Sequence, residues 1–135
     1  MTINEKISEG NKLITEYMGY QYEIGAGTEP SGWYKLIRCD ITDMERREYL
    51  CRNDSAIKYH KSWDWLMQVV EKIEENTPYK INILECDCEI YSIVSDGFIT
   101  HKNSIIDKSR DTKMEAIYDA IVDFIEWYNR KKKEL

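Results

Sequence analysis

Apolar residues recur at the spacing of an α-helix in three stretches of the chain. The first stripe consists of Ile3, Ile7, Ile14 and Met18. Gly19 follows it, where a glycine commonly ends a helix, so we expect a helix over residues 3–18. The last stripe consists of Met114, Ile117, Tyr118, Ile121, Phe124, Ile125 and Tyr128. Thr112 and Glu115 form a capping-box pattern before it and predict a helix over residues 113–130.

The central helical stretch, within residues 59–73, begins with a group of aromatic residues. Ser62 is a favourable N-cap, and Asp64 places a negative charge in the first turn, where the helix dipole stabilises it. The apolar stripe that follows consists of Trp63, Leu66, Val70 and Ile73. Because Trp63 and Trp65 lie about 200° apart around a helix, we expect one to face the core and the other to be partly exposed.

Alternating apolar and polar residues between these helices predict short strands. They cover residues 20–24, 33–38, 79–84, 88–93 and 98–100, and Tyr49 and Leu50 are compatible with one more. Asp96 and Gly97 form a strong turn dipeptide. The order of the elements predicts one α+β domain over residues 1–135, with an antiparallel sheet of about four to five strands and three helices packed mainly on one face.

The composition narrows the class of protein. The chain has 135 residues, of which 42% are hydrophobic and 33% are charged, as is typical of a globular protein. Its net charge of −6 argues against binding nucleic acid through a general positive field. No apolar run is long enough to span a membrane, and the polar first residues lack the apolar region of a signal peptide. We therefore expect a cytoplasmic protein whose four cysteines are reduced.

The one basic run comprises Arg130, Lys131, Lys132 and Lys133. It follows a predicted helix, and cations near the C-terminal carbonyls of a helix are favourable. This position favours a structural role over a nucleic-acid-binding tail.

Groups suited to catalysis or metal binding are sparse. The candidate metal ligands are Cys39, Cys51, Cys86, Cys88 and His60. Structural zinc sites normally separate paired ligands by two or more residues, and Cys86 and Cys88 have only one residue between them. There is no nucleophile-elbow motif and no glycine-rich phosphate loop. We expect no catalytic residue, metal or cofactor; a small hydrolase acting through His60 or a carboxylate is the less favoured alternative.

Several aromatic and basic residues stand at the starts of elements or beside loops. The candidate ligand site consists of Trp33, Arg38, Tyr59, His60, Lys61, Trp63 and Trp65. Amides at a helix N-terminus attract anions, and aromatic rings stack on bases, so this group predicts a site for a nucleotide-like ligand. The alternative is a hydrophobic staple in which Tyr59 or His60 packs back on Leu66 or Met67. The two interpretations are not exclusive.

Three segments carry a resemblance to known proteins. They are Asn11-Lys12-Leu13-Ile14 with Tyr17-Met18-Gly19-Tyr20, then Tyr59-His60 with Ser62-Trp63-Asp64-Trp65-Leu66-Met67 and Val69-Val70-Glu71-Lys72-Ile73, then Lys113 and Glu115-Ala116 through Phe124-Ile125 and Trp127-Tyr128-Asn129. On these residues the chain resembles small proteins of phages and prophages, especially of Bacteroidetes-type hosts. That family has no established activity, so the resemblance implies a context and assigns no residue a role.

Small acidic accessory proteins of phages often block host defence. They do so by occupying a host protein, by mimicking DNA charge, or by sequestering a nucleotide immune signal as a sponge. We therefore expect a non-enzymatic, homo-oligomeric binder of a nucleotide-like ligand. The alternative is an interaction module whose exposed aromatic residues bind a host or phage protein.

Overall fold

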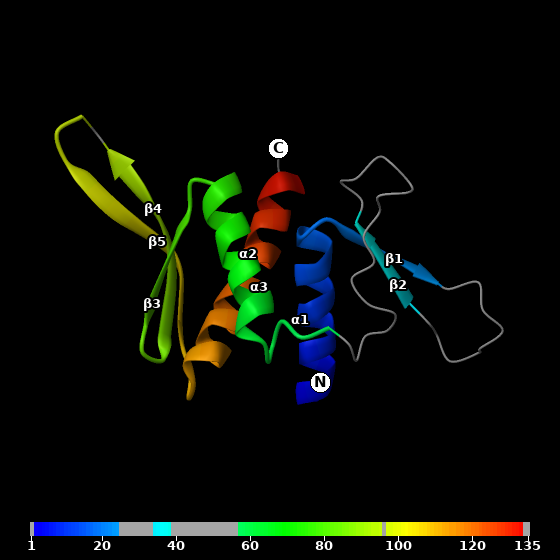
Figure 1. Cartoon of the computed structure of the whole chain (residues 1–135). Helices are drawn as coiled ribbons and strands as arrows, with labels where there is room; N and C mark the ends of the chain where they lie inside the picture. Colours follow the sequence, from blue (N-terminus) through cyan, green and yellow to red (C-terminus); the bar gives the residue numbers. More distant parts are fainter. Residues whose placement is uncertain (1, 25–33, 39–56, 96, 134–135) are drawn as a thin grey trace. The chain divides into compact units, whose positions relative to one another are not determined.

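The computed structural model describes residues 2–24, 34–38, 57–95 and 97–133 (Figure 1). The chain divides into two compact units, Met1–Lys58 and Tyr59–Leu135. The single domain over residues 1–135 stays a prediction. None of the helices in the described ranges combines the length and apolar character needed to span a bilayer.

The first unit contains a helix and a β-hairpin. Its elements are α1 (Ile3–Tyr17), β1 (Tyr20–Ile24) and β2 (Tyr34–Arg38). The hydroxyl of Thr2 caps α1 by accepting a hydrogen bond from the Glu5 N–H at 3.2 Å, and Gly19 leaves the helix with φ +93°. Gly19 ends the helix as predicted, because glycine tolerates a positive φ. The Thr2 hydroxyl satisfies a first-turn N–H. Strands β1 and β2 pair antiparallel with each other.

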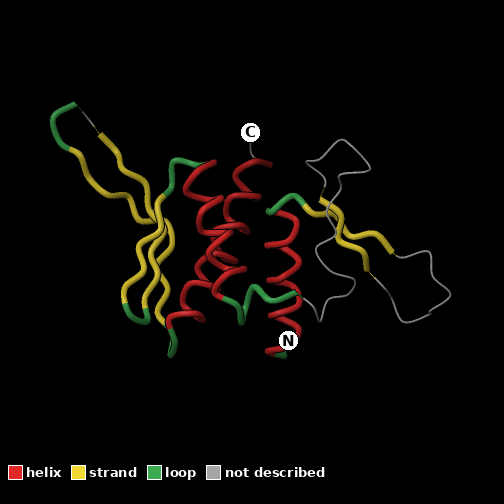
Figure 2. Tube along the Cα trace, viewed as in Figure 1, coloured by secondary structure: helices red, strands yellow, loops and turns green. Residues whose placement is uncertain are grey.

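The second unit packs two helices against an antiparallel sheet. Its elements are α2 (Trp63–Asn76), β3 (Lys80–Leu84), β4 (Asp87–Ser95), β5 (Thr100–Ser109) and α3 (Lys113–Lys133). The strand order is β3-β4-β5, so each strand lies beside its neighbour in the chain (Figure 2). Helix α3 contacts all three strands and α2 contacts β3, and both helices lie on one side of the sheet (Figure 1).

The predicted α+β class with three helices is confirmed, but a single sheet of four to five strands is not supported. The described strands form a three-stranded sheet and a separate two-stranded hairpin. Alternation of apolar and polar residues identifies a strand without naming its partner, which explains the error. β5 runs from Thr100 to Ser109, well beyond the predicted strand at 98–100. The weak strand candidate at Tyr49 and Leu50 lies outside the described residues.

The core of the second unit comes from the inward faces of both helices and from β4. The buried apolar residues of the helices are Leu66, Val69, Val70, Ile73, Ala116, Ile117, Tyr118, Ala120, Ile121, Phe124 and Ile125. On β4, Cys88 and Ile90 are fully buried, two residues apart on the same face of the strand. This alternation shows which face of the sheet meets the helices, and it fixes the register of β4.

Candidate functional site

The first turn of α2 is built as its sequence predicts. Ser62 has an extended backbone, and its hydroxyl accepts a hydrogen bond from the Trp65 N–H at 3.5 Å. Asp64 lies in the first turn, where the helix dipole favours a negative charge. Ser62 therefore marks the start of the helix, and residues 59–61 form the turn that leads into it.

Tyr59 belongs to the core, not to an exposed ligand site. Only 2% of its surface is exposed, and its ring meets the half-buried Trp65 ring edge to face, with centroids 5.1 Å apart. A ring must expose a face to stack on a base, so the structure contradicts a stacking role for Tyr59. The contact agrees in part with the staple alternative, since a residue before the helix packs back on its first turn, though the partner is Trp65.

Trp63 faces outward. It is 44% exposed, while Trp65 is half-buried, so the expectation that the two tryptophans face different environments is confirmed. Lys61 is also exposed. Trp63 and Lys61 are therefore the exposed members of the predicted site at the start of α2.

His60 is held against the core by Tyr118. The two rings meet edge to face with centroids 6.3 Å apart, and His60 is half-buried. Burial, together with the neighbouring Lys61 charge, lowers the pKa of His60 below its ordinary value of 6.5. Burial likewise raises the pKa of Tyr118. His60 is then mainly neutral at pH 7, so Lys61 supplies the positive charge in this turn.

The remaining two candidates belong to the first unit. Trp33 lies outside the described residues, and Arg38 is the last residue of β2, in the first unit. The predicted site residues that the structure brings together are Tyr59, His60, Lys61, Trp63 and Trp65.

The two described cysteines differ in their surroundings. Cys88 is buried in β4, and burial, aided by the charges of Asp107 and Glu89, raises its pKa to about 12. Cys86 lies in the turn between β3 and β4, where its thiol donates to the Asp111 carbonyl at 3.5 Å. Both thiols are free, and within the described ranges no three His, Cys, Asp or Glu side chains gather around a common point for a metal.

Sequence reasoning missed the most exposed apolar surface of the second unit, at the end of the β4–β5 hairpin. β3 pairs with β4 only from Leu84, which lies opposite Asp87, to Lys80, which lies opposite Tyr91. Beyond Tyr91, β4 pairs with β5 alone, so the two strands project past β3 as a ribbon (Figure 1). We call residues 92–95 and 97–103 the arm.

Large apolar side chains cover the outer part of the arm. Their exposed fractions are 56% for Ile93, 38% for Val94, 103% for Phe98 and 64% for Ile99. The signal for this surface lies in the sequence: Ile93-Val94 and Phe98-Ile99 are adjacent apolar pairs on either side of the turn. Neighbouring residues of a strand point to opposite faces, so one member of a pair within a strand must face away from the core.

Polar contacts hold the root of the arm. The Lys102 ammonium lies 2.6 Å from a Glu89 carboxylate oxygen and 5.4 Å from the centre of the Tyr91 ring. At Ile90 and Tyr91 the β4–β5 register shifts, since Ile90 pairs with Ile106 and Tyr91 with Ser104. β5 thus carries one extra residue, a β-bulge, where the third strand ends.

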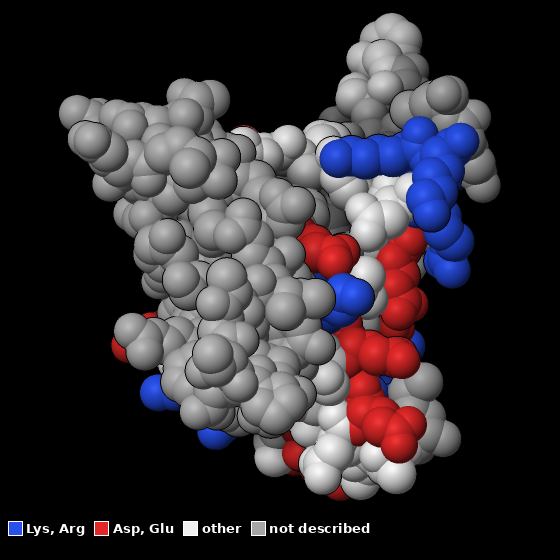
Figure 3. Space-filling view, turned by 90° about the vertical axis from the view of Figure 1, so that its right-hand side faces the viewer, with Lys and Arg blue, Asp and Glu red and all other residues white. Residues whose placement is uncertain are grey.

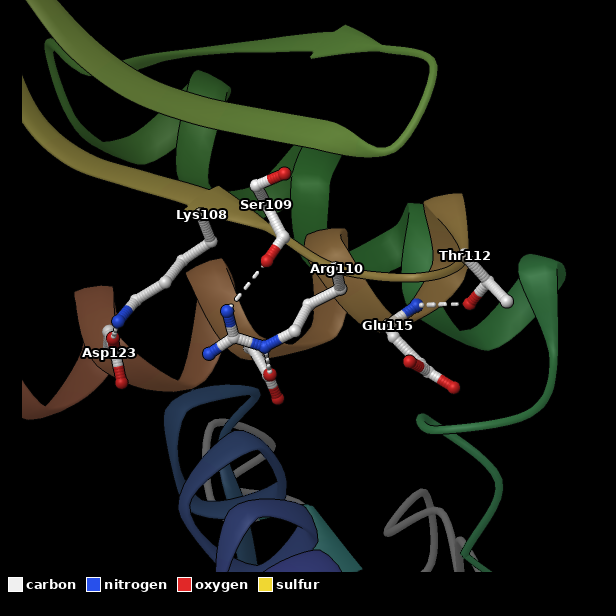
Figure 4. Close-up of polar contacts among 7 residues, drawn as sticks. Lys108, Ser109, Arg110, Thr112, Glu115 and Asp123 are labelled. Carbon is white, nitrogen blue, oxygen red and sulfur yellow. Dashed lines mark hydrogen bonds and ion pairs between the residues drawn. The ribbon is translucent and has the colours of Figure 1, made fainter.

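Further along β5, two ion pairs fasten the strand to α3. Lys108 reaches Asp123 at 2.6 Å, and the Arg110 guanidinium reaches Asp119 at 2.5 Å and donates to the Ser109 carbonyl (Figure 4). The hydroxyl of Thr112 caps α3 by accepting from the Glu115 N–H at 3.2 Å, as predicted. The arm is therefore an extension of an anchored strand.

The basic end of α3 packs on the aromatic residues of the same helix. Lys131 lies over the Trp127 ring at 5.9 Å, and Lys132 lies over the Tyr128 ring at 4.7 Å. Lys and Arg side chains gather at the top of Figure 3, the end of the molecule at which α3 ends in Figure 1. Cations that cover rings and face the helix C-terminus stabilise it, which supports the structural role over a nucleic-acid tail.

The fold and surface define an α+β protein with an exposed apolar β-arm. No protein-family model matches this chain, and no curated protein or solved structure matches it either.

Proposed function

We propose that this chain is a non-catalytic protein-interaction module and that the arm is its binding element. The observation that carries the proposal is the complete exposure of Phe98 beside Ile99, at the end of a hairpin that also exposes Ile93. Apolar groups gathered on one projection of a monomer mark a surface that binds another molecule.

The energetics favour binding through this surface. Burying a large apolar side chain gains roughly 1.5–3 kcal/mol, so three of them supply a gross gain of roughly 5–9 kcal/mol before the losses of association. The β4–β5 pairing fixes the backbone of Ile93 and extends to Ser95 and Thr100, on either side of the turn that carries Phe98 and Ile99. Less conformational entropy is then lost on binding than for an unstructured segment.

An affinity-capture experiment tests the proposal. Wild-type protein and Phe98→Ser are used as bait in a host lysate, captured proteins are identified, and the binding constant is measured with the purified partner. We expect Phe98→Ser to weaken binding at least about tenfold, as for a central aromatic anchor. The matched control is Ile3→Ser, which removes a 76% exposed apolar side chain from α1. Equal binding by wild type and Phe98→Ser contradicts the proposal.

A second candidate function is binding of a nucleotide-like ligand at the start of α2. The observation that favours it is the exposure of Trp63 next to Lys61 at a helix N-terminus. A base stacked on Trp63 gains about 1–3 kcal/mol, while Lys61 and the first-turn amides face its phosphate. Such a protein acts as a sponge, because it holds its ligand without altering it.

Native mass spectrometry with added nucleotides tests this second candidate. A discrete added mass that dissociates unchanged, and that Trp63→Ala abolishes, supports it. Trp65→Phe is the matched control, because it changes the tryptophan that packs on Tyr59 and leaves Trp63 in place. An adduct that persists in Trp63→Ala excludes this placement of the ligand.

Both candidates suit a cytoplasmic accessory protein of a phage that counteracts host defence, the context implied by the sequence resemblance. Plaque counts on a defended host that expresses wild type, Phe98→Ser or Trp63→Ala test this context. Protection of the phage by wild type alone, or by wild type and only one of the two variants, supports an anti-defence role and names the surface used. Equal plaque counts with and without the wild-type protein contradict it.

A further inference from the structure

We propose that the β5 half of the arm exchanges between two registers against β4, and that the contact of Lys102 with Glu89 holds it in the observed one. In the second register the bulge is absent and Ile105 pairs with Tyr91. This inference rests on the proposed function, because it assigns a regulation to the surface that the proposed function makes the binding element.

The root of the hairpin has one fixed register. Cys88 and Ile90 of β4 are fully buried, and Lys108 of β5 reaches Asp123 of α3 at 2.6 Å. A slip of β5 by one residue at this level would turn Lys108 to the opposite face of the sheet and break that contact. The exchange is therefore confined to the part of the hairpin beyond Ile106, where the observed register shifts.

The arm lacks the burial that would specify its register. A register is strongly specified only where one face of a strand is buried. In β4, Ile93 and Val94 point to opposite faces and are 56% and 38% exposed. In β5, every residue of Thr100–Ser104 is polar and exposed. Neither strand of the arm thus has a face that burial favours.

The second register keeps as many strand pairs as the observed one. The five residues Tyr91–Ser95 now pair with the five residues Thr100–Ser104. Without the bulge they pair with His101–Ile105, so Ile105 gains a partner and no pair is lost. The connecting loop grows from four residues to five, and both lengths are common in hairpins. The backbone therefore accommodates either register.

The contacts that favour the observed register converge on Glu89. The Lys102 ammonium lies 2.6 Å from its carboxylate and 5.4 Å from the centre of the Tyr91 ring. Hydrogen bonds from Lys102, and secondarily from Ser104, lower the pKa of Glu89 below its ordinary value. In the second register Lys102 lies opposite Val94, and Ser104 likewise moves to the face of β4 that points away from Glu89. Both contacts are then lost.

The exchange changes what the arm presents to a partner. Ile93 lies opposite Lys102 in the observed register and opposite Asn103 in the second. The charge of Lys102 therefore moves from the face that carries Ile93 to the face that carries Val94. A partner that binds one of these two surfaces better shifts the arm toward that register.

Two cysteine pairs that share Asn103→Cys distinguish the registers. Asn103 lies opposite Ser92 in the observed register and opposite Ile93 in the second. Opposed residues have Cβ atoms about 4.5–5.5 Å apart, close enough for a disulfide after small adjustments, whereas side chains on opposite faces point apart. Under mild oxidation we expect Ser92→Cys/Asn103→Cys to form its intramolecular crosslink quickly and Ile93→Cys/Asn103→Cys more slowly. Peptide mapping separates these crosslinks from any formed by the four native cysteines.

Adding Lys102→Gln to each cysteine pair tests the contact that holds the register. We expect it to raise the rate of the crosslink between positions 93 and 103 about two- to fivefold, the factor that corresponds to the loss of an exposed ion pair. Lys108→Gln is the matched control, because it removes the β5 lysine that pairs with Asp123 at the root. Absence of the crosslink between positions 93 and 103, or an equal rate with and without Lys102→Gln, overturns the inference.

The two proposals fail separately. If the crosslink between positions 93 and 103 forms as expected while Phe98→Ser changes no binding, the proposed function fails and the exchange of register stands. If that crosslink is absent while Phe98→Ser weakens binding, the inference fails and the proposed function stands.

Discussion

The ring of Trp65 meets the ring of Tyr59 edge to face, with centroids 5.1 Å apart and planes inclined by 72°. This contact ties the turn before α2 to the first turn of the helix. It also divides the aromatic start of α2 into two parts, since Tyr59 and Trp65 pack inward while Trp63 is 44% exposed.

Tyr59→Ala is expected to destabilise the protein strongly. Removing a fully buried aromatic ring leaves a cavity and costs about 3–5 kcal/mol of the free energy of unfolding. Urea denaturation followed by circular dichroism measures the loss. Trp63→Ala is the control, and we expect it to cost less than about 1 kcal/mol because the side chain is largely exposed. Equal losses in the two variants would contradict the division described above.

Phe124 is expected to be a second point of high sensitivity. It is fully buried on α3, and its ring lies 5.4 Å from Tyr79 and 5.7 Å from Tyr128, centre to centre. Phe124→Ala should lower the free energy of unfolding by about 3–5 kcal/mol. Phe124→Leu keeps most of the apolar volume and should lose clearly less. A thermal or urea transition that barely moves in Phe124→Ala would show that these rings do not form a packed cluster.

The stability of the second unit should fall as the pH drops below neutral. Burial lowers the pKa of His60 from 6.5, so between that value and the lowered one the unfolded chain binds more protons than the folded protein. The free energy of unfolding is therefore highest above pH 6.5 and decreases as the pH falls through that window. Urea midpoints from pH 7.5 to about pH 5 measure the slope. His60→Gln should reduce it, and an unchanged slope in that variant would assign the effect to other groups.

The ion pair between Arg110 and Asp119 should contribute modestly. The two side chains are 41% and 37% exposed, so solvent screens their interaction. A double-mutant cycle with Arg110→Ala and Asp119→Ala should give a coupling of about 0.2–1 kcal/mol, smaller at high salt. A coupling several times larger would mean that the pair is effectively buried.

Cys88 should resist alkylation in the folded protein. Its side chain is buried and its pKa is raised to about 12, so almost no thiolate is present at pH 8. Mass mapping after iodoacetamide treatment should find Cys88 modified in urea and unmodified in native buffer. Rapid native labelling of Cys88 would indicate that β4 detaches from the helices.

The parts of the fold that depend on local chemistry could be predicted from the sequence. Ser62 and Thr112 mark helix starts because their hydroxyls satisfy first-turn N–H groups, and Gly19 ends α1 because it adopts φ +93°. Strand pairing depends on contacts between distant segments, so the separation of the β1–β2 hairpin from the three-stranded sheet could not be predicted. β5 was underestimated because its outer half, Thr100–Ser104, is polar and lacks an apolar alternation.

The candidate site was only partly predictable for the same reason. The sequence places both Tyr59 and Trp63 near the start of α2, yet one is 2% and the other 44% exposed. Tyr59 precedes the helix, so helical periodicity does not assign it a face, and tertiary packing decides its burial. The arm could not be predicted because it begins where β3 no longer lies beside β4. How far β3 reaches along β4 depends on the pairing of the two strands, and the sequence of β4 alone does not give it.

The extra residue in β5 determines how the arm is oriented. It lies at the Ile90–Tyr91 register shift, where the sheet narrows from three strands to two. Because side chains alternate along a strand, one inserted residue exchanges the faces of everything beyond it. This exchange puts Lys102 on the same side as Glu89, and a bulge also bends and twists its strand. A single position in β5 thus sets the direction of the hairpin tip. It also sets the face of the arm on which a binding partner meets the charge of Lys102.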